Sequence, residues 1–145
     1  MTIKAMTVGD AARCAELFRD VFHGEPWREN WTIDTARKRL SQFADTKQFL
    51  GYVLEEKGRV IGLICGQREE YWDGPRFYIQ EFCVAQAYQG QGVGKRLLDH
   101  LTGQLEREGI TYLYLMTQRG ERTEGFYHRR GFQTDEDLVW MHKKG

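Results

Sequence analysis

The sequence predicts an α/β protein with a mixed sheet and helices on both of its faces. The first observation is the order of the hydrophobic periodicities, which reads β-α-α-β-β-β-α-β-α-β along the chain. The second is the nearly continuous apolar run Tyr112–Thr117, which is expected of a strand buried on both faces. With 145 residues, of which 41% are hydrophobic, we expect a single domain spanning residues 1–145.

The N-terminal part of the chain predicts one strand and two helices. Alternating residues favour a short edge strand at Thr2–Ala5. Apolar residues spaced three to four apart then predict a helix over Ala11–Phe22 and a second helix that runs to about Phe43. The residues that can cap or end these helices are Thr7, Asp10, Gly24, Pro26, Thr32 and Asp34.

The middle of the chain predicts three antiparallel strands. Phe49–Leu54 and Val60–Ile64 are strand-like, and Lys57-Gly58 between them is typical of a two-residue hairpin turn. A second turn at Tyr71–Pro75 leads into the strand Phe77–Val84.

The C-terminal half predicts alternating helices and strands. Leucines at helical spacing predict an amphipathic helix from about Val93 that ends at Gly109. The apolar strand Tyr112–Thr117 follows, then a short helix over Arg122–Arg130 and a final strand over Phe132–His142.

Composition excludes several classes of function. Lysine plus arginine (21) balance aspartate plus glutamate (21), so net charge gives no reason to expect nucleic acid or a membrane as partner. The cysteines, Cys14, Cys65 and Cys83, have no CxxC spacing, so we expect neither disulfides nor a metal site, and a reducing cytoplasm. No signal peptide and no apolar run of about 20 residues is evident.

A glycine-rich turn joins the strand Phe77–Val84 to the amphipathic helix. Gly90, Gly92 and Gly94 lie where the helix should begin, although each glycine in a helix costs about 1 kcal/mol relative to alanine. Glycines let a ligand approach the backbone, and N–H groups at a helix N-terminus attract anions. The turn therefore predicts a phosphate site. A Walker loop and a dinucleotide fingerprint both fail, because Gln89 and Lys95 stand where glycines would be required.

Two motifs resemble those of the GCN5-related N-acetyltransferases (GNAT). Gln89-x-x-Gly92-x-Gly94 is similar to the family's pyrophosphate loop, and Gly125–Phe132 is similar to its F-Y-x-x-x-G-F motif. The resemblance implies an acetyltransferase fold with a centrally splayed sheet and acetyl-CoA as cosubstrate. The Glu-Pro-Trp…Trp-Thr segment is similar to the aminoglycoside 6′-acetyltransferase-like branch. The residues expected to bind acetyl-CoA are Phe82, Cys83, Val84, Gln89, Gly90, Gln91, Gly92, Val93, Gly94, Lys95, Thr117 and Phe126.

Acetyl transfer to an amine needs a base and an acid. An alkyl ammonium has a pKa of ~10.4, so a positioned base assists its deprotonation at neutral pH. Glu81, alone in an apolar strand before the turn, is the candidate base; the alternative is that it pairs with an arginine or lines the surface. The resemblance makes Tyr127 the acid that protonates the leaving thiolate, although an aromatic on a helix is more often packing. We interpret Cys83 as a wall residue and not as a nucleophile.

Pantetheine binding and acceptor binding are predicted at two further places. By the resemblance, Phe82, Cys83 and Val84 offer backbone groups to the pantetheine amides at a β-bulge. Acids mixed with aromatic residues suit a cationic amine, but the same tryptophans could simply cover the core. The residues expected to bind the acceptor are Trp27, Glu29, Trp31, Tyr71, Trp72 and Asp73.

The resulting hypothesis is an N-acetyltransferase that moves acetyl from acetyl-CoA to a primary amine of a small molecule, by direct attack in a ternary complex. Two alternatives stay open: a protein lysine or N-terminal acetyltransferase, and a non-catalytic acyl-CoA-binding regulatory module. The family resemblance also allows a homodimer.

Overall fold

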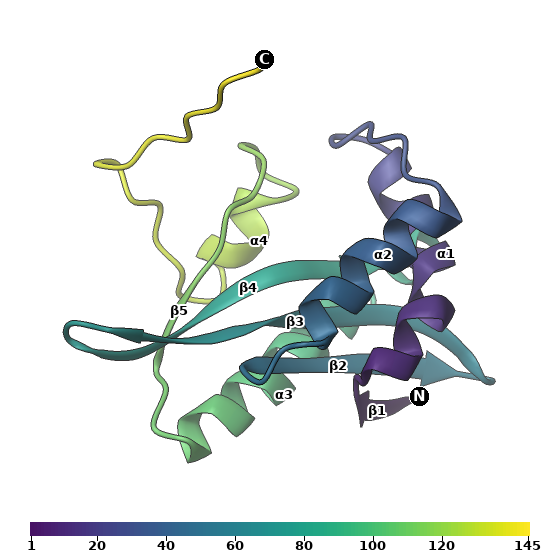
Figure 1. Ribbon diagram of the computed structural model, residues 1–145, viewed down its shortest axis with the longest axis horizontal. Coiled ribbons are helices and arrows are strands. Elements are labelled where there is room, and N and C mark those ends of the chain that lie inside the picture. Colours follow the sequence, from purple (N-terminus) through teal and green to yellow (C-terminus); the bar gives the residue numbers. More distant parts are fainter. The chain divides into compact units, whose positions relative to one another are not determined.

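The computed structural model describes all residues, 1–145, and divides into two compact units, residues 1–115 and 116–145. The first unit contains one sheet in the order β1-β2-β3-β4-β5 (Figure 1). Neighbouring strands are antiparallel except β4 and β5, which are parallel, so the sheet is mixed as predicted. The strands are β1 (Thr2–Ala5), β2 (Phe49–Glu56), β3 (Arg59–Tyr71), β4 (Gly74–Val84) and β5 (Tyr112–Tyr114).

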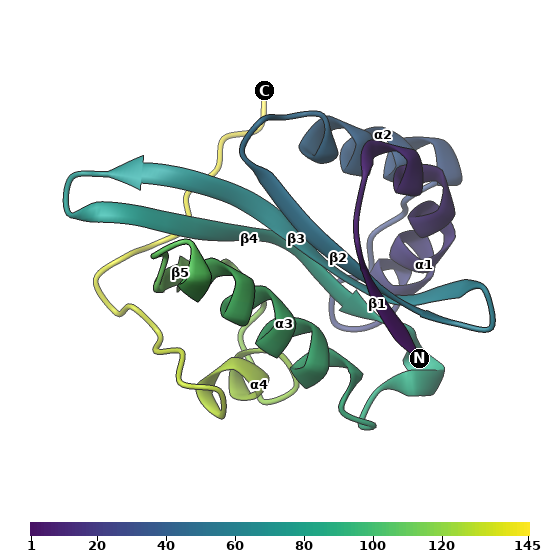
Figure 2. The ribbon, with the colours of Figure 1, turned by 90° about the horizontal axis from the view of Figure 1, so that it is seen from below.

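Helices cover both faces of this sheet, as the sequence predicted. Figure 2 shows α1 (Ala11–His23) and α2 (Ile33–Ala44) on one face and α3 (Val93–Arg107) on the other. The face under α1 and α2 holds a core of buried apolar side chains that includes Phe18, Leu40 and Leu63. None of the helices combines the length and the apolar character that crossing a membrane would require.

Local chemistry explains where the elements begin and end. Thr32 caps α2, because its hydroxyl accepts from Thr35 N–H at 3.0 Å while the Thr35 hydroxyl accepts from Thr32 N–H at 2.9 Å. Asp10 precedes α1 and accepts from Thr7 N–H at 2.8 Å. The turn between β2 and β3 is formed by Lys57 and Gly58, both at positive φ, as the hairpin signal indicated.

A β-bulge interrupts the pairing of β3 with β4. Cys65 lies opposite Glu81 and Gly66 lies opposite Ile79, so Gln80 is the extra residue on β4. A Cβ at Gly66 would overlap the carbonyl oxygen of Tyr78, so glycine is required there. The bulge that the resemblance placed at Phe82–Val84 thus lies earlier in the strand.

Two predictions about the C-terminal strands were wrong in detail. β5 spans only Tyr112–Tyr114 and not Tyr112–Thr117, and Tyr112 is exposed, so the strand is not buried on both faces. The second unit contains α4 (Glu124–His128) and no strand, so the predicted strand Phe132–His142 is absent. The carboxylate of Asp135 accepts from Asp137 N–H at 2.9 Å, an Asx turn that bends the backbone within that segment.

The apolar run that suggested the final strand is largely exposed. The four apolar residues of this run are 72–82% exposed: Leu138, Val139, Trp140 and Met141. Apolar residues alone do not make a strand, because each strand also needs a neighbour to satisfy its backbone N–H and C=O groups.

Candidate active site

Glu81 lies on β4 directly after the bulge and faces α2. In a regular strand consecutive side chains point to opposite faces of the sheet. Here Gln80 and Glu81 both contact the α2 side. The side-chain amide of Gln67 donates through Nε2 to Gln80 Oε1 at 3.0 Å and to the carbonyl oxygen of Phe43 in α2 at 3.0 Å. Glu81 accepts from Arg39 of α2. The bulge is what turns the Glu81 carboxylate toward α2.

The Glu81 carboxylate is buried and paired on one oxygen. Its side chain is 10% exposed, and Oε1 accepts from Arg39 Nη2 at 3.0 Å and Nε at 3.2 Å. Burial raises the pKa of Glu81 to about 7, although the guanidinium of Arg39 acts in the opposite direction; the carboxylate of Glu29 adds a smaller upward contribution. The structure thus shows the arginine pair that was the alternative interpretation of Glu81. A pKa of about 7 is compatible with a base at neutral pH, a role that stays a prediction.

The segment between α1 and α2 supplies aromatic and acidic side chains near this carboxylate. Trp31 donates its indole N–H to Glu29 Oε1 at 2.8 Å. The Trp31 ring packs edge-on against Phe18 at 5.0 Å, and the Trp27 ring packs against Phe22 at 5.0 Å. Both tryptophans thus help to cover the core, which was the alternative interpretation, while Trp31 also holds Glu29 in place.

The other predicted acceptor residues lie at the far end of the β3–β4 hairpin. Tyr71, Trp72 and Asp73 form its tip, which projects beyond the rest of the sheet in Figure 1, and Trp72 is 87% exposed. Glu81 lies seven positions after Gly74 on β4, roughly 23 Å at ~3.3 Å per residue. The structure therefore does not bring these residues together with Glu29 and Trp31.

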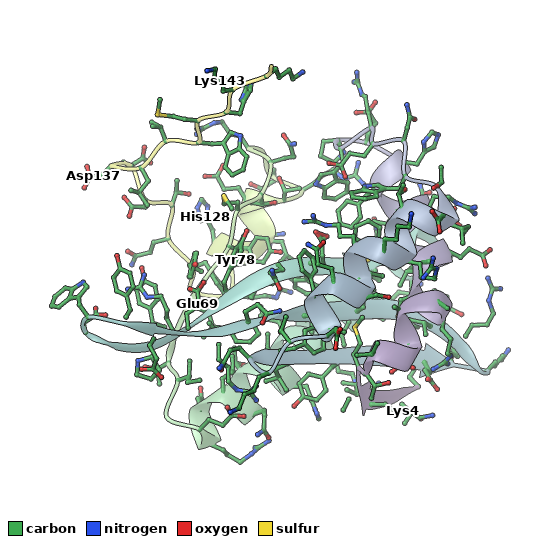
Figure 3. The ribbon with its side chains drawn as sticks, in the orientation of Figure 1. Lys4, Glu69, Tyr78, His128, Asp137 and Lys143 are labelled. Atoms are coloured by element: carbon green, nitrogen blue, oxygen red, sulfur yellow. The ribbon has the colours of Figure 1, made fainter.

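An inner cluster lies along the same hairpin. Figure 3 labels Glu69 of β3 and Tyr78 of β4, and both contact Tyr114 of β5: the Tyr78 ring stacks on it at 4.8 Å, and Tyr114 donates its hydroxyl to Glu69 at 2.7 Å. The Arg76 guanidinium lies over the Tyr71 ring at 3.5 Å. This arrangement stiffens the base of the hairpin.

The edge of β4 opposite β3 carries no strand partner beyond Tyr78. β5 pairs with β4 only from Arg76 to Tyr78. Ala85 N–H donates to Ile61 O of β3 at 2.8 Å, so by alternation the peptide groups of Phe82 and Val84 face away from β3. An extended amide chain can add to such an edge.

The environment of Cys83 does not favour a nucleophilic role. Its side chain is buried, and burial raises the pKa of its thiol well above the ordinary value. A reactive cysteine requires the opposite, a thiolate stabilised at neutral pH. The interpretation from the sequence agrees with this environment.

The glycine-rich turn presents unpaired backbone donors at the N-terminus of α3. The first backbone bond into the helix runs from Arg96 N–H to Gly92 O at 3.0 Å, so the N–H groups of Val93, Gly94 and Lys95 precede the helical ladder. Gly92 has φ 82°, a conformation that favours glycine. Beyond its chain neighbours, no protein atom lies within 4 Å of a Cβ placed on Gly90 or Gly92. The arrangement fits an anion such as a diphosphate.

Side chains of the turn fold back onto the backbone. Gln89 donates to Val84 O at 3.0 Å, and Gln91 donates to Ala87 O at 3.1 Å. Lys95 pairs with Asp99 one turn later at 2.7 Å. The two glutamines therefore fix the path of the turn, and the backbone amides remain as its anion donors.

In the second unit, Tyr127 lies on α4 between two aromatic rings. Its ring packs against Phe126 at 5.2 Å and Phe132 at 5.4 Å, and its carbonyl accepts from Phe132 N–H at 3.0 Å. Thr117 is exposed and precedes α4 outside any regular element. The F-Y-x-x-x-G-F motif thus forms a compact helical turn.

Two features of the site had no part in the sequence analysis. The first is Arg39, which is separated from Glu81 by 42 positions. The second is the position of the bulge, for which Gly66 is the available signal; it lies inside β3 but beyond the predicted strand Val60–Ile64.

The family model and the related proteins that match this chain all describe acetyltransferases. The model of the acetyltransferase (GNAT) family matches residues 13–132. N-alpha-acetyltransferase RimI of Mycobacterium tuberculosis is 29% identical over 133 residues, 92% of this chain and 78% of that protein. The L-methionine sulfoximine/L-methionine sulfone acetyltransferase of Salmonella typhimurium is 32% identical over 114 residues, 75% of this chain and 66% of that protein.

Solved structures share the fold. An aminoglycoside acetyltransferase from an uncultured soil metagenomic sample, crystallised with trehalose, superposes with a TM-score of 0.77 at 17% identity, covering 99% of this chain and 95% of that one. The α/β fold, the glycine-rich turn before α3 and the family match over most of the chain agree. The chain belongs to the acetyltransferase (GNAT) family, whose members are acetyl-transferring enzymes that use acetyl-CoA.

Proposed function

We propose that this enzyme acetylates a primary amine of a small molecule by direct attack in a ternary complex. The observation that carries the proposal is Glu81, a buried carboxylate with a pKa of about 7 on β4, beyond the segment Arg76–Tyr78 that pairs with β5. A base is most effective when its pKa lies near the working pH, because it is then both deprotonated and able to hold a proton.

Acetyl-CoA would bind along β4 and the start of α3. When bound, it supplies an acetyl group activated as a thioester. The N–H groups of Val93, Gly94 and Lys95 suit its diphosphate, and the peptide groups of Phe82 and Val84 suit its pantetheine amides.

Two side chains would carry the protons of the reaction. Glu81 accepts a proton from the amine through water, and the amine nitrogen bonds to the acetyl carbon as the carbon–sulfur bond breaks. Tyr127 donates its hydroxyl proton to the departing sulfur. The acceptor nitrogen, which arrives as an ammonium, releases two protons: Glu81 takes one, and the other returns through solvent to Tyr127, so that the products are an amide and a thiol.

A small cationic acceptor fits the surroundings of Glu81. The Glu29 carboxylate, held by Trp31, adds negative charge, and the indole provides an aromatic surface. Relatives act on acceptors of this kind by name: methionine sulfoximine in one case and aminoglycosides in another.

A second candidate is acetylation of a protein N-terminus. One relative that aligns with 92% of this chain is named an N-alpha-acetyltransferase. The exposed Tyr71 and Trp72 at the hairpin tip, roughly 23 Å along β4 from Glu81, could contact a chain extending from the reaction site but not a small amine.

A thiol-release assay separates these candidates. Acetyl-CoA is supplied with a panel of small amines and of peptides with free N-termini. We expect turnover with small amines, and Trp72→Ala should leave it unchanged. Turnover with peptides alone, reduced by Trp72→Ala, would assign the protein-directed activity. CoA binding without any turnover would identify a non-catalytic module.

A further inference from the structure

Arg39 on α2 contacts the carboxylate of Glu81 in an asymmetric way. Both of its hydrogen bonds, from Nε at 3.2 Å and from Nη2 at 3.0 Å, end on Oε1. A fork-to-fork pair, in which each nitrogen contacts its own oxygen, is the usual arrangement of arginine with a carboxylate. Here the second oxygen, Oε2, accepts no hydrogen bond from the protein. It is also not completely sealed from the surface. One oxygen is held and the other remains accessible.

The guanidinium itself is fixed by aromatic rings. Its central carbon lies 4.6 Å from the Phe43 ring centroid and 5.7 Å from the Trp31 ring centroid. The buried Leu40, the next residue on α2, anchors this part of the helix in the core. The two rings flank a guanidinium whose side chain is 37% exposed, and they limit how far it can turn away from the Glu81 carboxylate.

The Arg39–Glu81 ion pair is not expected to add much to the stability of the fold. The Glu81 side chain is 10% exposed and that of Arg39 is 37% exposed, so it is chiefly the carboxylate that is taken out of water. Burying a charge is costly, and an apolar residue at position 81 would avoid that cost. The bulge at Gln80 turns Glu81 away from the α3 face and toward Arg39, so the pair exists only because the strand departs from regular geometry. This combination motivates a functional interpretation.

We propose that Arg39 is a positioning residue of the acetyl transfer reaction: it holds Glu81 by Oε1 and leaves Oε2 directed at the water that relays the amine proton. The inference rests on the proposed function, because it assigns Arg39 a role through Glu81. Arg39 does not touch the reacting atoms. Its positive charge keeps the buried carboxylate ionised at a pH where burial alone would protonate it.

The electrostatic surroundings of Glu81 determine how a loss of Arg39 is felt. Arg39 is the one cation that acts on it, and Glu29 opposes ionisation. Three other titratable groups interact with the Glu81 carboxylate: Cys65 of β3, and Tyr78 and Cys83 of β4. All three are neutral at pH 7. Without Arg39 nothing on these elements compensates for burial, so the pKa of Glu81 must rise.

The test is the pH dependence of kcat/KM for one accepted amine at saturating acetyl-CoA. For Arg39→Met we expect the acidic limb of the profile to move up by at least about one pH unit, which is about a tenfold loss at pH 6 and little loss at pH 9. Arg39→Lys keeps the charge and should recover part of the activity at pH 6. Arg37→Met is the matched control, because Arg37 lies on the same helix but pairs with the exposed Asp34 at 2.8 Å.

The outcomes distinguish this inference from the proposed function. If Arg39→Met lowers kcat/KM by the same factor at every pH, Arg39 is only structural and the inference is wrong. If Arg39→Met does not fold, the Arg39→Lys and Arg39→Gln profiles decide in the same way, with a shift expected only for glutamine. Glu81→Gln is measured in parallel. An unaffected Glu81→Gln enzyme overturns both proposals, whereas an impaired one with an unshifted Arg39→Met profile overturns only the role of Arg39.

Discussion

At the scale of single residues, the carboxylate of Glu81 couples the chemistry of the site to the stability of the fold. Its pKa is about 7 in the folded chain against an ordinary 4.5, because burial disfavours the charged form. Below pH 4.5 both the folded and the unfolded chain hold this proton. As the pH rises toward 7, the unfolded chain releases it first, so the folded state is progressively destabilised.

Replacing Glu81 with glutamine should remove this pH dependence. Relative to Glu81→Gln, the wild-type free energy of unfolding should fall by roughly 3 kcal/mol between pH 4 and pH 8, from about 1.36 kcal/mol per pKa unit. Urea denaturation at several pH values measures the difference. A difference that stays constant with pH, or that grows in favour of wild type as the pH rises, would contradict the raised pKa.

Gly92 offers a test of the phosphate site in which shape and charge are separated. Asparagine and aspartate both tolerate its left-handed backbone better than other residues do, and a side chain there meets open space. We expect Gly92→Asp to bind acetyl-CoA at least about tenfold more weakly than Gly92→Asn, because a carboxylate repels a diphosphate. Titration calorimetry compares them. Equal affinities of the two variants would mean that no anion binds near this turn.

Tyr127 is expected to act on chemistry and not on binding. Tyr127→Phe keeps the ring between Phe126 and Phe132 but lacks the acidic proton, so turnover should fall about a hundredfold or more while the acetyl-CoA dissociation constant stays the same. Rapid-mixing kinetics and calorimetry supply the two numbers. Tyr112→Phe, at an exposed tyrosine of β5, is the control. Equal losses of turnover and affinity would count against the proton-donor role.

At the scale of elements, the bulge in β4 is what makes Glu81 available. A Cβ at Gly66 would meet the Tyr78 carbonyl, so Gly66→Ala forces the strands to shift. Forced repacking of this kind costs about 1–3 kcal/mol, and it should also disturb the orientation of Glu81. We expect a lower midpoint of thermal unfolding together with reduced turnover.

The matched control for this substitution is Gly103→Ala in α3. Its nearest neighbour would be 3.8 Å from the new methyl group, and alanine is the better helix former, so stability should rise by about 0.5–1 kcal/mol. If Gly66→Ala matched Gly103→Ala both in the midpoint of thermal unfolding and in turnover, the bulge would not matter for stability or for catalysis.

The elements differ in how far local sequence determines them. The Thr32 cap of α2, the Lys57-Gly58 turn and the glycine-rich start of α3 depend on neighbours within a few residues, and the sequence predicted all three. The final strand was predicted wrongly because its apolar run carries no information about a strand partner. Backbone pairing is a tertiary property.

In the candidate site, too, some residues can be recognised from the local sequence and others depend on tertiary packing. Glu81 is conspicuous as an acid in an apolar strand, so its importance could be predicted from its neighbours. Its partner Arg39 could not, because α2 carries two arginines, Arg37 and Arg39, and only the packing of that helix on the sheet selects one of them. The six predicted acceptor residues separate into two groups at different ends of β4 for the same reason.

At the scale of the whole molecule, one face of the sheet contributes the proposed base and the N-terminus of α3 contributes the proposed anion donors. Both follow from β4, which carries Glu81 beside α2 and ends in the turn that opens α3. A single strand thereby connects the expected proton acceptor with the expected cosubstrate site. The family match over residues 13–132 covers all of these parts.

The most direct test of the central claim is whether thiol release from acetyl-CoA is coupled to amine acetylation and depends on Glu81. Thiol is followed by a chromogenic reagent and acetylated product by mass spectrometry, for wild type and Glu81→Gln with the same small amine. We predict one thiol for each acetylated amine in wild type, and at least about a hundredfold slower formation of both by Glu81→Gln at pH 7. Wild-type rates from Glu81→Gln, or thiol release without an acetylated product, would contradict the account.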